Sequence, residues 1–234
     1  MFSFSIDIAN LIIHIDCRYR YTYSLCSAYI VDNDNYNFAV SVDEEDIAYE
    51  KDSLKDSSFS IGYIESLAIH RKIAERVIDY NRCLIHGASV GIDNKGFLFL
   101  ADSGTGKSTH IKLWLDNISS AYVINGDKPL LIFNDDDIYV CGTPWCGKEG
   151  LSNKLNVPLR GIVLLNRGLD NSIDVIDPSL CFESILRQIY IPKDRDKLNR
   201  TIEFIKDLSY RVPLYNMFCN MDKSAAYMAY RSIV

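Results

Sequence analysis

The feature that most constrains the fold of this 234-residue chain is the stretch 98–114, LFLADSGTGKSTHIKLW. It begins with an apolar run, typical of a strand buried on both faces, and continues into a loop of Gly, Ser and Thr with one Lys. Behind this loop, apolar residues recur at helical spacing, which predicts an amphipathic helix from Ser108 onward. They are Ile111, Trp114, Leu115 and Ile118. A strand, a glycine loop and a helix in this order favour an α/β protein with a phosphate-binding loop.

The loop carries the residue types that phosphate binding needs. The pattern G-x-x-x-x-G-K-[ST] is complete except at its first position, where Ala101 stands in place of Gly, a small change if the local φ is negative. We expect Lys107 to reach the β- and γ-phosphates of a nucleotide and the Ser108 hydroxyl to bind Mg²⁺. The predicted ATP-binding residues are Asp102, Ser103, Gly104, Thr105, Gly106, Lys107, Ser108 and Thr109. The alternative is a chance Gly/Ser turn before a helix.

Bulk composition narrows the class of protein. The net charge of −6, with Lys and Arg scattered, gives no electrostatic case for binding nucleic acid or an anionic membrane. No uncharged apolar run approaches the length of a membrane span, and the N-terminus does not resemble a signal peptide. We therefore expect a cytoplasmic protein whose seven cysteines are reduced, without a zinc site.

The remaining pattern predicts a mixed α/β order with too many hairpin signals for a regular doubly wound sheet. Helices are expected over 64–80, around 198–208, after Asp177-Pro178 and after Asp222, and a solvated loop over 43–58. The acidic run 135–137 is expected to be a hairpin turn, because adjacent carboxylates in a strand point to opposite faces and do not converge on one metal ion. The predicted strands are 10–16, 25–31, 37–42, 83–92, 96–101, 121–125, 130–133, 137–141, 161–166 and 212–218.

Two motifs together resemble a known family. The segment H-G-A-S-V-G-I from His86, followed by a hairpin and then L-F-L-A-D-S-G-T-G-K-S-T, resembles the C-terminal catalytic domain of HPr kinase/phosphorylase, which is related to the ATP-dependent phosphoenolpyruvate carboxykinases. The resemblance implies an α/β phosphate-loop fold with mixed β-sheets over 83–234. It leaves 1–82 as a small β-rich region with one helix. It also implies an ATP- and Mg²⁺-dependent serine kinase that acts on a peptide or small protein.

The resemblance also suggests roles for residues outside the loop. The family has two acidic residues after the next strand; here the segment is Y-V-I-N-G-D-K-P, with Asp127 at the second position and Gly126 at the first. By this match Asp127 is the catalytic base and a metal ligand, His86 a catalytic residue beside Lys107, and Glu149 a further metal ligand. From the residues alone, Asp127 is as well explained as an aspartate of a turn. His86 alone would be interpreted as a structural histidine at the end of a strand.

Several residues stay open at this stage. The stretch 143–150, TPWCGKEG, is either a substrate-side loop with Lys148 as an anion contact or a hairpin with a packed Trp145. Arg160, Arg167 and Arg211 are all available to contact phosphate or acceptor, and spacing does not select one. Three histidines are expected to be structural, and one of them, in the first turn of the helix, to face solvent. They are His14, His70 and His110, and we expect His110 to be the one that faces solvent.

Two other functions compete with a serine kinase. Gly126 and Ala101 favour a non-catalytic nucleotide-binding module, whereas a carboxykinase acting on a small acid is disfavoured by chain length. The identity of the acceptor and the oligomeric state are left open by the sequence.

Overall fold

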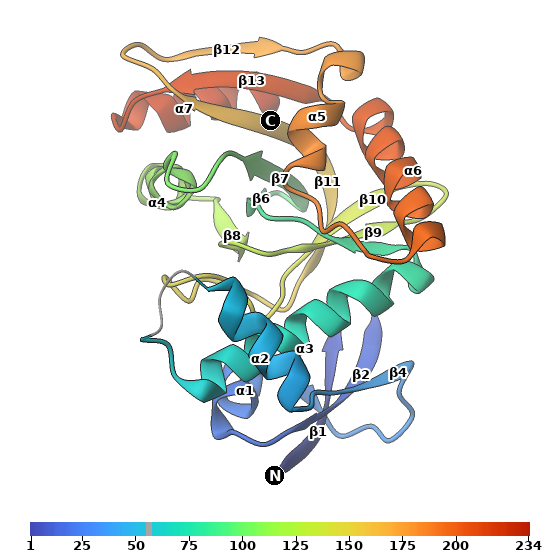
Figure 1. Ribbon diagram of the computed structural model, residues 1–234. Helices are drawn as coiled ribbons and strands as arrows, with labels where there is room; N and C mark the ends of the chain where they lie inside the picture. The colour runs from blue at the N-terminus through green and yellow to red at the C-terminus, as the bar shows by residue number, and fades with distance from the viewer. Residues whose placement is uncertain (55–57) are drawn as a thin grey trace. The chain divides into compact units, whose positions relative to one another are not determined.

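The computed structural model describes residues 1–54 and 58–234, which divide into two compact units, Met1–Tyr80 and Asn81–Val234. Both units combine helices with β-sheet, so the chain has a mixed α/β structure (Figure 1). None of the helices in these ranges is long and apolar enough to cross a membrane.

The first unit has a four-stranded sheet in the order β3-β1-β2-β4. β1 (Phe2–Ile8) and β2 (Leu11–Cys17) form an antiparallel hairpin. Both of its turn residues have positive φ, the geometry that matches the twist of the strands. β4 (Phe38–Ser41) runs parallel to β2, and β3 (Ile30–Val31) adds a two-residue edge. Two helices pack on α3 (Ile61–Val77): α1 (Arg20–Leu25) and α2 (Glu44–Ser53). Short 3₁₀ turns occupy Ser27–Tyr29 and Ile78–Tyr80.

The strand predicted over 25–31 is wrong except for its last two residues, because a helix and a 3₁₀ turn precede β3. The cause is a contact distant in sequence. The fully buried carboxylate of Glu65, on α3, accepts backbone N–H groups of Arg18 and Tyr19 at 2.7 and 3.1 Å. These bonds hold the chain that leads into α1, which sequence analysis missed.

The loop predicted over 43–58 is also wrong where α2 lies, and its part over 55–57 falls outside the described residues. Ile47 is the only buried residue of α2, so apolar periodicity gave no helical signal. A capping box between Asp43 and Asp46 starts α2. Glu50 of α2 forms an ion pair with Arg71 of α3 at 2.5 Å. The capping residues were the signal available in the sequence.

The second unit has one large mixed sheet organised by the long strand β11 (Asn156–Arg167). Its first half pairs with β10 (Ile138–Cys141), which continues to β9 (Leu130–Phe133) and β5 (Arg82–Leu84), all antiparallel. Its second half lies between β7 (Lys95–Leu100) and β13 (Leu214–Cys219) and runs parallel to both. The three parallel strands therefore end at one edge of the sheet, where the loop after β7 also lies (Figure 1).

The flanks of this sheet complete the unit. β6 (Ala88–Ile92) and β8 (Tyr122–Asn125) extend it beyond β7, and β12 (Ser172–Val175) pairs with β13. α4 (Lys107–Asn117) packs against α7 (Lys223–Ile233), and both join a core around Phe97, Phe99 and Trp114. The remaining helices are the 3₁₀ turn Pro178–Leu180, α5 (Phe182–Leu186) and α6 (Arg195–Arg211).

Most predicted elements of this unit are confirmed, including the hairpin turn at 135–137 between β9 and β10 and the Asp222 cap of α7. The strand predicted over 83–92 is wrong at its centre: it is broken into β5 and β6, with His86 between them. β12 was missed, and Asp177 caps a 3₁₀ turn rather than a full helix.

Candidate functional site: a glycine loop beside an Asp–His pair

The loop after β7 has the backbone shape of an anion cradle. Gly104 and Gly106 have φ of 80° and 123°, conformations that residues with a side chain rarely adopt. An added Cβ at either glycine would meet no atom within 4 Å, so open space lies in front of the loop. α4 begins directly behind it, with Gly106 as its N-cap and no side chain capping its first N–H groups. Such a helix start offers free donors and partial positive charge to an anion.

Lys107 places a buried cation in this cradle. Its side chain is 8% exposed, and its Nζ donates to the carbonyl oxygen of Ala101 at 2.8 Å, within the same loop. Burial lowers the pKa of Lys107, while the charges of Asp127 and Asp102 act in the opposite direction. No carboxylate in the described ranges forms an ion pair with it directly. A bound anion would therefore compensate a charge that the protein itself leaves only partly balanced.

Asp127 and His86 form the second part of the site. The Asp127 carboxylate lies 3.3 Å from Nε2 of His86, and Nδ1 of His86 lies 3.0 Å from Oε1 of Gln188. Burial alone would raise the pKa of Asp127. The hydrogen bond from His86 and the charges of Lys128, His86 and Lys107 outweigh burial and hold this pKa below its ordinary value. Asp127 is therefore ionised at neutral pH, with the His86 ring against it.

A buried asparagine that the sequence analysis did not select fixes Asp127 in place. Oδ1 of Asn125 accepts the backbone N–H groups of Asp127 and Lys128 at 2.9 and 2.7 Å. Its Nδ2 donates to the carbonyl oxygen of Thr143 at 3.0 Å. Asn125 is fully buried, so this turn is tied to the neighbouring segment rather than to solvent. The signal for it in the sequence was the side-chain-to-backbone turn that an Asn two residues before an Asp favours.

The absence of a second acidic residue at position 126 has a steric basis. An added Cβ on Gly126 would lie 2.9 Å from the carbonyl oxygen of Cys146 and 3.3 Å from that of Leu151. Gly147, at φ 79°, passes against the Asp127 side chain, which a Cβ there would meet at 3.1 Å. The segment that follows Trp145 thus occupies the space that a side chain at 126 would need. Trp145 itself is buried, at 5% exposed, whereas Lys148 is exposed.

The predicted metal ligands are placed unevenly. Ser108 is exposed at the first turn of α4, Asp127 is half-buried, and Glu149 is exposed in a turn after β10. Across 1–54 and 58–234, no group of three His, Cys, Asp or Glu residues is arranged to hold a metal ion. Mg²⁺ at a phosphate loop takes most of its ligands from phosphate and water, so a hydroxyl and one carboxylate fit that role.

His110 does not face solvent, and that prediction is wrong. It is 2% exposed, and its Nε2 accepts the indole N–H of Trp114 at 3.0 Å. Burial lowers its pKa from 6.5 to about 4. The ring centroids of His110 and Phe99 lie 4.9 Å apart, because His110 is on the buried face of α4 together with Ile111 and Trp114.

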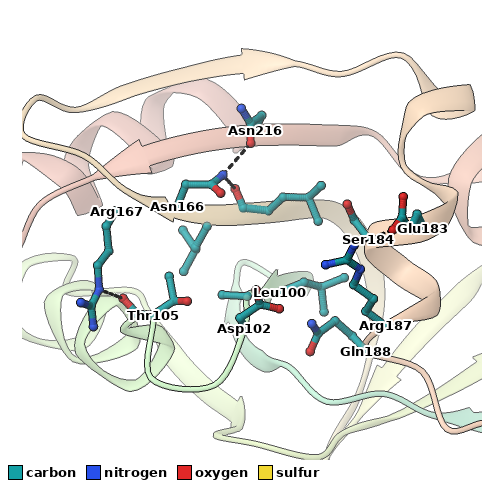
Figure 2. A pocket seen from close by; sticks show the side chains of 13 residues that line it. Leu100, Asp102, Thr105, Asn166, Arg167, Glu183, Ser184, Arg187, Gln188 and Asn216 are labelled. Carbon is teal, nitrogen blue, oxygen red and sulfur yellow. Dashed lines mark hydrogen bonds and ion pairs between the residues drawn. The ribbon is translucent and has the colours of Figure 1, made fainter.

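A cavity of about 410 Å³ opens beside the loop, at the ends of the parallel strands (Figure 2). One wall is the loop itself, with Asp102 and Thr105, and the opposite wall comes from α5 and the residues after it, with Arg187 and Gln188. Ligands of open α/β sheets bind at this kind of edge. Because Gln188 contacts both the cavity and His86, the cavity adjoins the Asp–His pair.

Comparisons with known proteins add one distant structural similarity. No protein-family model matches the sequence, and no curated protein is similar to it. Among solved structures, the chain is similar to the Hpr(Ser) kinase/phosphatase from Coxiella burnetii, with 13% sequence identity and a TM-score of 0.35. This match covers 63% of the present chain and 94% of that one. The neighbour is a kinase/phosphatase, and a likeness this distant establishes neither fold family nor function for this chain.

Proposed function

We propose that this protein binds ATP with Mg²⁺ and transfers the γ-phosphate to a serine hydroxyl of a peptide or small protein. The observation that carries the proposal is the glycine cradle at the start of α4, with a buried lysine in it and an ionised carboxylate nearby. Phosphoryl transfer needs little covalent chemistry from a protein. It needs a held γ-phosphate, compensated charge and an oriented acceptor.

The loop residues supply the binding part of this proposal. Backbone N–H groups of Gly106 and the first turn of α4 donate to the phosphates, and Lys107 turns from the Ala101 carbonyl to the β- and γ-phosphate oxygens. The Ser108 hydroxyl and the Asp127 carboxylate would hold Mg²⁺, with Glu149 as a more distant candidate ligand. When bound, Mg²⁺ would neutralise the charge that develops between the β- and γ-phosphates.

In this proposal Asp127 is the general base of the reaction. As the serine oxygen forms its bond to phosphorus and the bond to the ADP oxygen breaks, the serine proton passes to the Asp127 carboxylate. His86 is fixed between the two groups, with its Nε2 3.3 Å from the Asp127 carboxylate and its Nδ1 3.0 Å from Oε1 of Gln188. His86 therefore orients the carboxylate and stabilises its ionised form.

Gly126 supports a second candidate, a nucleotide-binding module without catalysis. The crowding at this position leaves Asp127 as the single carboxylate of the turn, to serve both metal and acceptor. The kinase proposal is preferred because Asp127 is half-buried and ionised, is held by His86 and the Asn125 turn, and interacts electrostatically with Lys107 of the loop; a perturbed carboxylate beside a phosphate cradle is typical of functional sites. Phosphate transfer from ATP distinguishes the two.

The binding test uses Lys107→Ala. Calorimetry with Mg·ATP should show at least about tenfold weaker binding than in the wild type, the scale for losing a charge-assisted hydrogen bond. The exposed Lys112, on the same helix, provides the matched control Lys112→Ala, which should bind normally. Equal affinity for Lys107→Ala and wild type would show that the loop is not the nucleotide site.

The catalytic test uses Asp127→Asn, which keeps the shape of the side chain and removes its charge. Turnover should fall by roughly 10²-fold or more while affinity for ATP changes little, because the carboxylate acts mainly in the transition state. Slow hydrolysis of ATP serves as the readout until the acceptor is known. Full activity in the variant would place the base elsewhere; no phosphate transfer by the wild type to any serine peptide would favour the non-catalytic module.

A further inference from the structure

Three arginines that sequence spacing did not separate have different partners in the structure. Arg160, in the first half of β11, pairs with Asp137 at 2.7 Å. Arg211, at the end of α6, donates to the carbonyl oxygen of Asn134 at 2.7 Å. Both partners belong to the turn between β9 and β10, so neither arginine contacts the glycine loop.

Arg167 is the arginine that reaches the glycine loop. It is the last residue of β11, which extends three residues beyond its last pairing with β7, between Leu164 and Leu100. Its Nη2 donates to the carbonyl oxygen of Gly104 at 2.5 Å. Its Nε donates to the carbonyl oxygen of Thr105 at 3.3 Å (Figure 2). One guanidinium thus binds two successive carbonyl groups of the cradle.

These two bonds set the orientation of the peptide groups. In a trans peptide the C=O of one residue and the N–H of the next point in opposite directions, and the described chain has no cis peptide bonds. Holding the carbonyl of Thr105 toward Arg167 therefore turns the N–H of Gly106 away from it. Holding the carbonyl of Gly104 turns the N–H of Thr105 in the same way, toward the carbonyl of Asp102, which it meets at 3.2 Å.

The positive charge of Arg167 strengthens this effect. Within 1–54 and 58–234, no carboxylate forms an ion pair with Arg167, so its side-chain bonds go to neutral carbonyl groups. A carbonyl that accepts a bond from a cation is polarised, and the N–H of the same peptide becomes a better donor. The guanidinium suits the task because its planar fork meets two acceptors at once, which a lysine ammonium does less well.

We propose that Arg167 is a positioning residue that fixes the glycine loop, with the Thr105 N–H turned to the Asp102 carbonyl and the Gly106 N–H turned away from Arg167, ready for a phosphate anion. Arg167 lines the cavity beside the loop and acts on the cradle through the carbonyl groups of Gly104 and Thr105. The proposal deepens the proposed function, on which it rests for the identity of the anion, and the loop geometry itself is testable without any nucleotide.

The test compares Arg167→Gln and Arg167→Lys with Arg160→Gln, an arginine variant on the same strand that leaves the loop untouched. Calorimetry with Mg·ATP and with inorganic triphosphate should show both Arg167 variants binding about tenfold more weakly, by the same factor for both ligands. Arg160→Gln should bind as the wild type does. Melting temperatures should stay close together, because the contact is at the exposed rim of the loop.

A second readout follows the loop in the protein without ligand. Nitrogen–proton NMR spectra should show shifted amide signals for Thr105 and Gly106, and faster hydrogen exchange there, in both Arg167 variants but not in Arg160→Gln. If the wild type binds no triphosphate, the proposed function fails and this readout alone decides the role of Arg167. Wild-type affinity in Arg167→Lys would mean that only the charge matters and would overturn the proposal. Unchanged loop amides in both variants would overturn it as well.

Discussion

Acidification should destabilise this protein through His110, which is buried without charge on the core face of α4. Its Nε2 accepts the Trp114 indole N–H, so the neutral ring carries its proton on Nδ1, and this atom has no hydrogen-bond partner in the described structure. Protonating the ring would break the bond to Trp114 and place a charge between Phe99 and Trp114. The folded protein therefore resists a protonation that the unfolded chain accepts freely.

The size of the effect follows from the two pKa values. Burial lowers the pKa of His110 to about 4, against 6.5 in the unfolded chain. Between these values the unfolded state binds more protons, so stability falls as the pH falls. From pH 7 to pH 5, linkage predicts a loss of about 2 kcal/mol from this group alone. That is a large part of the stability of a typical domain.

Urea unfolding at pH 7 and at pH 5 measures this loss, with His110→Gln as the comparison. A glutamine oxygen is able to accept the Trp114 N–H and does not titrate, so the variant should lose about 2 kcal/mol less than the wild type over the same interval. The difference between the two proteins cancels the other titrating groups. Equal losses in both would refute the reasoning and show that His110 is hydrated or titrates normally in the folded state.

Two further predictions concern the site. Gly126→Ala should lower the free energy of unfolding by about 1–3 kcal/mol in urea, because its Cβ would meet the Cys146 carbonyl oxygen at 2.9 Å; an unchanged midpoint would show that the neighbouring segment moves aside without cost. Binding of Mg·ATP should take up protons at alkaline pH, above the lowered pKa of Lys107 and below 10.5, because an anion next to the ammonium raises that pKa. Calorimetry in two buffers of different ionisation heat measures the uptake, and its persistence in Lys107→Ala would assign it to another group.

The sequence by itself determined the local elements of the second unit. The strand before the loop, the glycines at 104 and 106, the helix predicted from Ser108, which begins at Lys107, and the hairpin turn at 135–137 all follow from short-range rules. Apolar periodicity shows which residues are buried together, and glycine marks where the backbone needs positive φ. The same rules failed for α2, where a single buried residue left no periodic pattern to detect.

Only the tertiary structure decided which distant residues share the site. Gln188 meets His86 across 102 positions, and Arg167, rather than Arg160 or Arg211, meets the loop. The first contact arises from an antiparallel bridge between Ile85 and Ile189, and the second because β11 lies parallel to β7 and ends beside the loop; no local pattern encodes either pairing. The burial of His110 has the same origin, since a helix in isolation does not reveal which of its turns faces the sheet.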